Sequence, residues 1–277
     1  MNIYIINTKR GVSIVPISFD KQKAIFLGEF IEIAESMYLP GVTNPPQPSN
    51  FPKGWRIVNN INAHAIVGLI DQKEFMGFVA QSLDVPSMFA VVFRGTRGIL
   101  DALEDFDFDM IDFEMIPNAG KTEHGFTRFY QSLSFVDPIS GDSLDFENYL
   151  KGLPQTISFR VAGYSLGGAL ATLLVMVLAY HRIPVEVYTF ASPMVGNAEF
   201  VKMYNTLVHN TYRIVNSPDI VPRLPSAFFD YQHVTGPFLI NSQKYPETKR
   251  NIYCYHNLEV YLYILGATNT NLGKCKA

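Results

Sequence analysis

The sequence predicts an α/β fold in which a mixed, mostly parallel central sheet is flanked by helices. Residues 157–180 read as a buried strand that leads through a tight turn into an apolar helix. From there to residue 215, strand-type and helix-type segments alternate at the intervals of β-α-β units. No composition break, repeat or low-complexity linker divides the 277 residues, so we expect one domain over residues 1–277.

Hydrophobic periodicity and turn residues place the other elements. Apolar residues at helical spacing predict a first helix over Lys21–Tyr38, which ends before Pro40-Gly41 and a proline-rich loop. An edge hairpin is expected before this helix, and a three-stranded meander with turns at Asp71-Gln72-Lys73 and Val85-Pro86-Ser87 after it. The expected strands are Ile3–Ile6, Val12–Phe19, Ala65–Ile70, Phe75–Gln81, Phe89–Arg94, Ile157–Val161, Val185–Phe190, Thr211–Val215 and Tyr231–Ile240. The expected later helices are Phe126–Phe135, Gly167–Tyr180, Asn197–Leu207 and His256–Leu265.

Composition restricts the class of protein. With 48% hydrophobic and 17% charged residues, the chain can bury a large core. Its net charge of −3, without a long cluster of Lys and Arg, argues against nucleic acid as a partner and fits small or lipidic substrates. The longest apolar run, Gly167–Tyr180, is shorter than the ~20 residues that span a bilayer, so we expect no integral membrane segment.

The first residues and the cysteines bear on the cellular compartment. The start, MNIYIINTKRGVS, carries its positive charges after the apolar stretch and does not resemble a signal peptide. We therefore expect a protein that is cytoplasmic, or secreted with its leader absent from this sequence. Cys254 and Cys275 are the only cysteines. We expect two unpaired thiols, the alternative being one bridge that tethers the C-terminal tail beside His256. Neither cysteine has the spacing of a metal site.

The turn at Gly163-Tyr164-Ser165-Leu166-Gly167 carries the most specific chemical signal. It is a G-x-S-x-G match between a buried strand and a helix, the context that presents a serine nucleophile. Glycine at 163 and 167 removes side chains that would collide in so tight a turn. The helix N-terminus directs backbone N–H groups towards Ser165, where negative charge develops in acyl transfer. The alternative is a glycine-rich turn with an ordinary solvated serine.

A serine needs a histidine to take its proton and a carboxylate to orient that histidine. After a serine on such a turn, the acid and then the histidine follow along the chain. Of the downstream acids, Asp219 comes just past a predicted buried strand, in a loop stiffened by prolines. Of the downstream histidines, His256 lies in the loop before the last helix, which suits a proton shuttle. His233, inside a strand pattern, is its main rival. The other acids are Glu186, Glu199, Asp230, Glu247 and Glu259, and the other histidines are His181 and His209.

Five blocks in order resemble the signatures of the fungal-type class 3 lipases. They are FRGT (Phe93–Thr96), GYSLGG (Gly163–Gly168), TFASPMVGN (Thr189–Asn197), NSPDIVPRLP (Asn216–Pro225) and YHNLEVY (Tyr255–Tyr261). The match runs from about residue 60 to 265, and several ordered blocks are far more specific than the serine turn alone. The resemblance implies the α/β-hydrolase fold, a catalytic triad of Ser165, Asp219 and His256, and no metal or organic cofactor. It also implies an oxyanion hole formed by Leu166 and Thr96, and Gly95 permits the sharp turn that such a donor requires.

The chain departs from the family pattern at three positions. Tyr164 stands where the family usually has histidine before the serine, which implies altered packing with the chemistry preserved. Glu123 occupies the histidine position of the family's V-H-x-G-F block, so a hydrogen bond near the oxyanion loop is expected to differ. Ala102 replaces the tryptophan that commonly sits in the family's lid, the short segment that covers the serine.

An acidic segment follows the FRGT block. Residues 98–120 contain seven acids and no Lys or Arg. Ile99, Leu100 and Leu103 can share one helical face, which predicts a short amphipathic lid near residues 97–105. Phe106, Phe108 and Met110 then alternate with acids as in an edge strand. Alternating strand positions leave Asp105, Asp107 and Asp109 without a chelating loop, so we expect no calcium site.

The resemblance implies a carboxylic-ester hydrolase, first of all a triacylglycerol lipase that releases fatty acids through a Ser-His-Asp acyl-enzyme mechanism. A phospholipase A1 or a feruloyl-type esterase on the same fold is the alternative, and a catalytically silent lipid-binding protein is the alternative from another class. The expected partner is a lipid or other ester substrate, met at an oil–water interface. Many carboxylates near the site repel anionic lipid surfaces and favour neutral esters.

Overall fold

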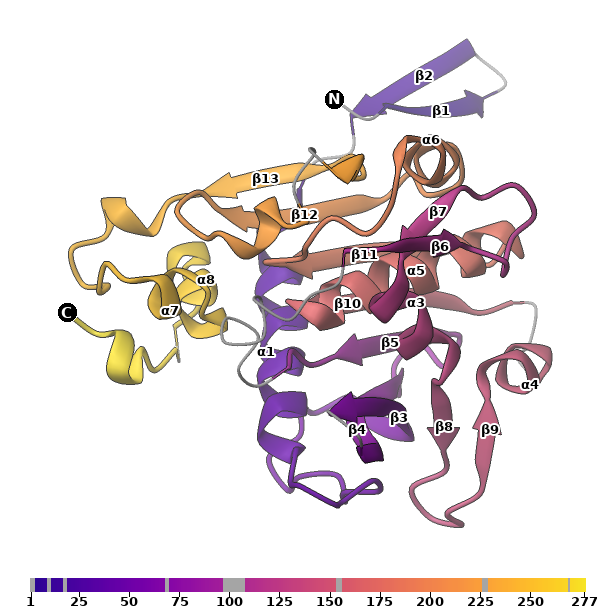
Figure 1. Cartoon of the computed structure of the whole chain (residues 1–277), viewed down its shortest axis with the longest axis horizontal. Helices are drawn as coiled ribbons and strands as arrows, with labels where there is room; N and C mark the ends of the chain where they lie inside the picture. The colour runs from indigo at the N-terminus through magenta and orange to yellow at the C-terminus, as the bar shows by residue number, and fades with distance from the viewer. Residues whose placement is uncertain are drawn as a thin grey trace.

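A mixed sheet of nine strands runs through the described part of the chain (Figure 1). The computed structural model describes residues 3–8, 11–16, 19–67, 70–96, 108–152, 156–225, 229–268 and 270–277. In sheet order the strands are β13 (Pro237–Ile240), β12 (Thr211–Asn216), β11 (Val185–Phe190), β10 (Ser158–Tyr164), β5 (Met88–Phe93), β4 (Ile70–Ser82), β3 (Trp55–Val67), β8 (Ser134–Val136) and β9 (Ser143–Asp145). The half of the sheet that contains β13, β12, β11, β10 and β5 is parallel. The pairs β5–β4, β4–β3, β3–β8 and β8–β9 in the other half are antiparallel. The predicted mixed α/β sheet is confirmed.

Helices cover both faces of this sheet and enclose two apolar clusters. The residues of α3 (His124–Gln131), α5 (Leu166–Tyr180) and α6 (Ala198–Leu207) belong to one cluster. Those of α1 (Lys21–Met37) and α8 (Leu258–Leu265) belong to the other. Two short helices, α4 (Phe146–Lys151) and α7 (Ile252–Tyr255), complete the α-helices of the described residues. Helix α5 is buried along nearly its whole length, because every residue from Leu166 to Leu178 is shielded from solvent.

Helix α1 forms where its sequence signals predict it. The carboxylate of Asp20 accepts a hydrogen bond from the backbone N–H of Lys23 and so caps the first turn. The apolar face of the helix buries Leu27, Phe30 and Ile31 completely, and the helix ends three residues before Pro40. Capping and burial therefore act on the same segment, which explains why this element was predictable.

The meander before β5 differs from the prediction. A strand over Ala65–Ile70 was expected, but β3 ends at Val67 and β4 begins at Ile70, and these two residues face each other across an antiparallel pair. The expected turn at Asp71-Gln72-Lys73 lies inside β4. No strand was expected over the Asn-rich start of β3, where Asn60 is fully buried and its side-chain amide donates to the carbonyl of Pro45. The strand is defined by its antiparallel pairing with β4.

Three other boundaries were wrong. Helix α3 ends at Gln131, and the end of the expected Phe126–Phe135 helix belongs instead to β8. Only Pro237–Ile240 of the expected Tyr231–Ile240 strand pairs in the sheet. The last helix begins at Leu258, not at His256, because the side chain of Asn257 caps the N–H of Val260. Periodicity alone does not reveal such caps.

Several sequence expectations fall on residues that the structure does not describe. Residues 97–107, with the lid expected near 97–105 and its candidates Ile99, Leu100 and Leu103, lie outside the described part. At the end of the expected Phe106–Met110 strand, Met110 begins β6 (Met110–Asp112), which pairs with β7 (Lys121–Glu123) in a separate small sheet. The N-terminal strands β1 (Ile3–Thr8) and β2 (Gly11–Pro16) pair with each other, as the expected hairpin does. The single-domain organisation stays a prediction. No described helix is both long and apolar enough to cross a membrane.

The two cysteines form a disulfide, so the expectation of unpaired thiols was wrong. Cys254 and Cys275 are joined across 21 residues of sequence. The bridge ties α7 to the C-terminal residues and packs against the fully buried side chain of Val260. The last residues of the chain are thereby attached beside the loop that follows α7.

Helices α1 and α8 bring three carboxyl groups together. Glu29 and Glu32 lie on α1, and Glu259 lies in the first turn of α8. Burial raises the pKa of Glu32 to about 7, and the charges of Glu259 and Glu29 add to that effect. Burial also raises the pKa of Glu29. Near neutral pH, Glu32 therefore takes up a proton that the unfolded chain would not hold.

We predict that Glu32→Gln stabilises the protein above pH 7 and has little effect at pH 4. The raised pKa means that the folded state binds Glu32's proton more tightly, so this contribution is complete below pH 4.5 and is lost as pH rises towards 7. A neutral amide avoids the loss, which we expect to amount to about 1–2 kcal/mol after discounting for solvent screening. Urea unfolding of wild type and Glu32→Gln at pH 4, 6 and 8 measures this difference in the free energy of unfolding. Equal stabilities at pH 8 would contradict the raised pKa of Glu32.

Candidate active site

Ser165 sits in the turn between β10 and α5 with an unusual backbone conformation. Its φ of 56° and ψ of −123° are values that non-glycine residues rarely adopt, and its side chain is fully buried. The Ser165 N–H donates to the carbonyl of Phe190 at 2.9 Å, and its own carbonyl accepts from Gly168 at 2.8 Å. The strained conformation is held by the neighbouring strand and by the helix that starts here, as is typical of functional turns.

The glycines on either side of Ser165 stand where a side chain has no room. A Cβ at Gly163 would lie 2.0 Å from the carbonyl oxygen of Gly167. A Cβ at Gly167 would lie 2.4 Å from the carbonyl oxygen of Arg94. Both collisions are with backbone, which cannot move aside, so glycine at 163 permits the tight turn and glycine at 167 permits its close packing on the end of β5.

Ser165, His256 and Asp219 form one hydrogen-bonded relay. His256 Nε2 lies 2.9 Å from Ser165 Oγ, and His256 Nδ1 lies 2.8 Å from Asp219 Oδ2. All three residues are buried, with exposed fractions of 0%, 6% and 1% for Ser165, His256 and Asp219. The three come from the turn after β10, the loop after α7 and the loop after β12. The structure thus brings together the three side chains that the sequence singled out.

The Asp219 carboxylate is held by groups outside the relay. Its Oδ1 accepts from the backbone N–H of Val221 at 3.0 Å, and its Oδ2 accepts from the hydroxyl of Tyr261 at 2.7 Å. That hydroxyl in turn accepts from the backbone N–H of Asn216 at 3.1 Å. Burial, followed by the charge of Asp219, raises the pKa of Tyr261 well above its ordinary value. The phenol therefore stays protonated and serves as a permanent donor.

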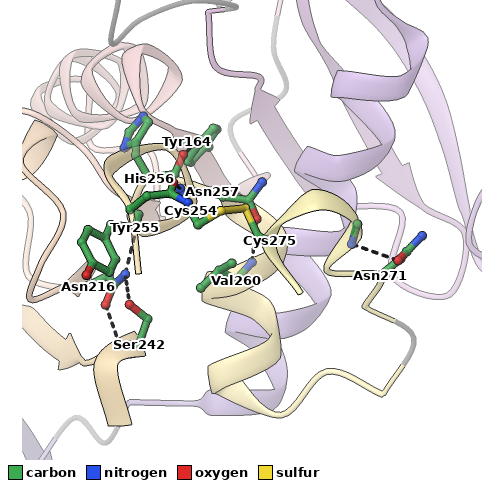
Figure 2. The surroundings of a disulfide bond; sticks show 12 residues. Tyr164, Asn216, Ser242, Cys254, Tyr255, His256, Asn257, Val260, Asn271 and Cys275 are labelled. Atoms are coloured by element: carbon green, nitrogen blue, oxygen red, sulfur yellow. Dashed lines mark hydrogen bonds between the residues drawn. A yellow bond between two sulfur atoms is a disulfide. The ribbon is translucent and has the colours of Figure 1, made fainter. Parts of the chain in front are cut away.

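Tyr164, Asn216 and the disulfide surround the His256 loop (Figure 2). The Tyr164 hydroxyl donates to the backbone carbonyl of His256 at 2.8 Å, and its ring stacks on the imidazole with centroids 5.0 Å apart. The amide of Asn216 donates to the carbonyl of Tyr255 at 2.9 Å. Cys254, two residues before the imidazole, is bonded to the C-terminal tail. These contacts fix the main chain on which the histidine is carried.

The residues expected to form an oxyanion hole, Thr96 and Leu166, follow neighbouring parallel strands. Phe93 at the end of β5 pairs with Gly163 of β10, so the chain leaves both strands at the same edge of the sheet. Leu166 is the first residue of α5, in the turn whose N–H groups have no acceptor within the helix. The positive end of the helix dipole therefore points to the side on which Ser165 stands.

The rival histidines are engaged elsewhere. His233 Nε2 contacts the carbonyl oxygen of Pro222, and burial together with the nearby Arg213 lowers the pKa of His233 to about 4. His181 follows the last turn of α5, with its ring edge-on to Tyr180. These contacts engage both rings outside the relay.

The structure adds residues that sequence reasoning missed. Tyr261 and Asn216 lie inside the blocks quoted from the sequence, but nothing in their spacing indicates a bond to Asp219 or to the histidine loop. Glu123, at one departure from the family pattern, caps α3 through its carboxylate, which accepts from the N–H groups of Gly125 and Phe126. The glutamate therefore has a local structural role in this chain.

Metal-binding groups do not converge in the described residues. In that part of the chain, no group of three or more His, Cys, Asp or Glu side chains is arranged to hold a metal ion. The absence of a cofactor stays a prediction of the sequence.

Comparison with known proteins gives concordant matches. Residues 90–229 match the family described as Lipase (class 3). The chain is 30% identical over 231 residues to "Phospholipase A1-II 3" of Oryza sativa subsp. indica, covering 71% of this chain and 54% of that protein. It is 24% identical over 184 residues to "Secreted mono- and diacylglycerol lipase 1" of Fusarium solani, covering 66% of this chain and 53% of that protein. The chain thus spans about half the length of these curated relatives.

A solved structure also resembles this one. The Lip2 lipase from Yarrowia lipolytica superposes with a TM-score of 0.61 at 22% sequence identity, over 85% of this chain and 84% of that chain. At this level of identity the likeness concerns the fold, and it confirms the α/β-hydrolase fold expected from the sequence.

We predict that replacing both bridged cysteines, Cys254→Ala with Cys275→Ala, lowers the free energy of unfolding by about 3 kcal/mol, because a loop of this length is no longer closed in the unfolded chain. Denaturant unfolding without reductant measures the difference. Wild type unfolded in the presence of a reductant is the matched control and should approach the double variant. Coincident unfolding curves for the variant and the oxidised wild type would show that the bridge contributes nothing.

Proposed function

The chain belongs to the class 3 lipase family, and from that premise we propose that it hydrolyses the carboxylic esters of lipids with Ser165 as nucleophile. The observation that carries the proposal is the buried relay, in which His256 lies within hydrogen-bond distance of both Ser165 Oγ and Asp219 Oδ2. Three such groups, all buried and in the expected order along the chain, come together by chance far less often than a single serine motif occurs.

The reaction proceeds through an acyl-enzyme. Ser165 Oγ attacks the ester carbonyl while His256 Nε2 takes the hydroxyl proton. His256 then donates this proton to the departing alcohol, and the C–O bond of the ester breaks. A water molecule attacks the acyl-serine in the same way, and the fatty acid leaves as Ser165 regains its proton. Asp219 keeps the imidazole oriented and stabilises its cation in both halves of the cycle.

Backbone N–H groups stabilise the negative charge of the tetrahedral intermediates. We assign this role to Thr96 and Leu166, with the Thr96 hydroxyl as an additional donor. Nucleophile, base and oxyanion donors are then all supplied by the protein, so the proposed chemistry requires no metal or organic cofactor.

Neutral lipid esters are the first substrate class that we propose, with triacylglycerol as the main candidate. The support is electrostatic: residues 98–120 carry seven acids and no base, which disfavours an anionic lipid surface. A phospholipase A1 activity is the second candidate, because the rice relative with 30% identity bears that name. A feruloyl-type esterase shares the same relay and has no comparable support. The partner that this activity implies is a lipid or other ester substrate, met at an oil–water interface.

We predict that Ser165→Ala loses at least about 10³-fold in kcat on a soluble p-nitrophenyl ester while remaining folded, and that Asp219→Asn loses nearly as much. Circular dichroism checks the fold, and a fluorophosphonate probe checks labelling of Ser165. His233→Ala serves as the control and should retain activity, because His233 bonds to Pro222 instead of the relay. Activity that survives in Ser165→Ala, or wild type that resists labelling, would refute the proposed nucleophile.

We predict that the wild type hydrolyses triolein faster than phosphatidylcholine, and either of these lipids faster than methyl ferulate. The three substrates should be measured side by side as emulsions or mixed micelles, with Ser165→Ala as the blank. Adding an anionic phospholipid to the triolein emulsion should slow release, because the acidic segment repels that surface. Faster release from phosphatidylcholine would instead establish the second candidate.

A further inference from the structure

The peptide group between Gly95 and Thr96 is held by a buried cation. Arg94 is only 2% exposed, and its Nη1 donates to the carbonyl oxygen of Gly95 at 2.7 Å. Its Nε donates to the carbonyl of Phe75 at 2.7 Å, and its Nη2 forms an ion pair with Glu74 at 3.2 Å. The guanidinium also stacks over the ring of Tyr38, 3.8 Å from the centroid. One planar group therefore joins the chain after β5 to β4 and to the residue that follows α1.

The preceding peptide group is held from α1. Glu35 Oε1 accepts a hydrogen bond from the backbone N–H of Gly95 at 2.8 Å. A Cβ at Gly95 would lie 2.7 Å from the ring of Tyr164, so the chain at this residue is covered by the side chain that stacks on His256. Charged groups thus fix Gly95 on both sides, its N–H through Glu35 and its C=O through Arg94.

The direction of the Thr96 N–H follows from the geometry of a peptide. The Gly95–Thr96 peptide has the ordinary trans form, in which the C=O and N–H bonds point in opposite directions. Arg94 draws the Gly95 carbonyl into the buried interior, and the Thr96 N–H must then point the other way. Phe93 of β5 pairs with Gly163 of β10, so Thr96 and Ser165 both follow the same edge of the sheet.

We propose that Arg94 and Glu35 are positioning residues that clamp the Gly95–Thr96 segment and aim the Thr96 N–H at the oxyanion. This inference rests on the proposed function, because it needs Thr96 to act as an oxyanion donor. An oxyanion hole is effective when its donors are fixed before the charge develops. A cation bonded to the carbonyl oxygen also polarises the same peptide group and strengthens its N–H as a donor.

The charge of the clamp is compensated in the interior. Burial lowers the pKa of the Arg94 guanidinium, and the carboxylates of Glu35 and Glu74 oppose that effect. Arginine remains charged across the working pH range of proteins. Only its planar fork can reach Phe75, Gly95 and Glu74 together, since a lysine carries its donors on one nitrogen.

The alternative is that Arg94 serves stability alone. Its bonds to Phe75 and Glu74 would stabilise the sheet whether or not Thr96 takes part in catalysis. The two roles differ in what they affect: a stability role changes the free energy of unfolding, whereas the clamp changes kcat and the affinity for a tetrahedral adduct. The KM for substrate should hardly respond to the clamp, because the oxyanion exists only after attack.

Five proteins test the clamp: wild type, Arg94→Lys, Glu35→Met, Glu35→Gln and Glu74→Gln. Each is assayed for kcat and KM on a soluble p-nitrophenyl ester, for inhibition by butylboronic acid, which forms a tetrahedral adduct with serine, and for unfolding in urea. We expect Arg94→Lys and Glu35→Met to lose about 10- to 100-fold in kcat with KM within about twofold, because a donor misplaced by ~1 Å costs on that scale. Butylboronic acid affinity should fall in parallel. Glu35→Gln keeps an oxygen acceptor and should retain most of the activity.

Glu74→Gln is the matched control, because it removes the ion pair and leaves the bond between Arg94 and Gly95. It should lose stability with kcat within about twofold of wild type. The clamp is wrong if Arg94→Lys and Glu35→Met keep kcat and boronic acid affinity, or if Glu74→Gln loses as much of both as they do. If Arg94→Lys does not fold, the pair Glu35→Met and Glu35→Gln decides. A wild type without Ser165-dependent hydrolysis refutes the proposed function itself, and that result is visible before any clamp variant is compared.

Discussion

The contact between the turn at Ser165 and the end of β5 determines the rest of the site. The two backbones approach so closely that a Cβ at Gly167 would collide with the carbonyl of Arg94. Ser165 stands in this turn at a positive φ, α5 starts directly after it, and the FRGT segment lies against the turn. Because parallel pairing of β5 and β10 fixes the register, the nucleophile and the proposed oxyanion donors share one edge of the sheet. The other two relay residues, Asp219 and His256, come from other loops.

A buried relay of this kind requires every polar group to be satisfied. The Asp219 carboxylate has the His256 imidazole, the Tyr261 hydroxyl and the N–H of Val221 as partners, so its desolvation is compensated. Two of these donors are themselves fixed by secondary structure, since Tyr261 lies in α8 and Val221 begins a short 3-10 helix over Val221–Arg223. A carboxylate held by one donor alone would be free to rotate, and the imidazole would rotate with it. The partners outside the relay therefore contribute orientation as well as solvation.

The sequence predicted the parts of this molecule in which a local signal and the fold agree. Helix α1 has both a cap and an apolar face, and the strand–turn–helix around Ser165 combines two glycines with buried neighbours, so both were predictable. Asp219 and His256 required only chain order and loop position. Other features depend on contacts distant in sequence: the start of β3, where no strand was expected, pairs with the end of β4, and the disulfide joins residues that no spacing rule relates. The bonds made by Tyr261, Arg94 and Glu35 are likewise visible only in three dimensions.

Tyr164 connects the two halves of the proposed machinery. Its ring covers Gly95 on one side and stacks on His256 on another, and its hydroxyl holds the carbonyl of His256. A shift of this one side chain would move the proton acceptor and the oxyanion segment together, because both contact the same rigid ring. Burial raises the pKa of Tyr164 well above its ordinary value, so its hydroxyl remains a donor and the link does not depend on pH. Tyr164, the residue before the nucleophile, therefore contacts both the proposed general base and the oxyanion segment.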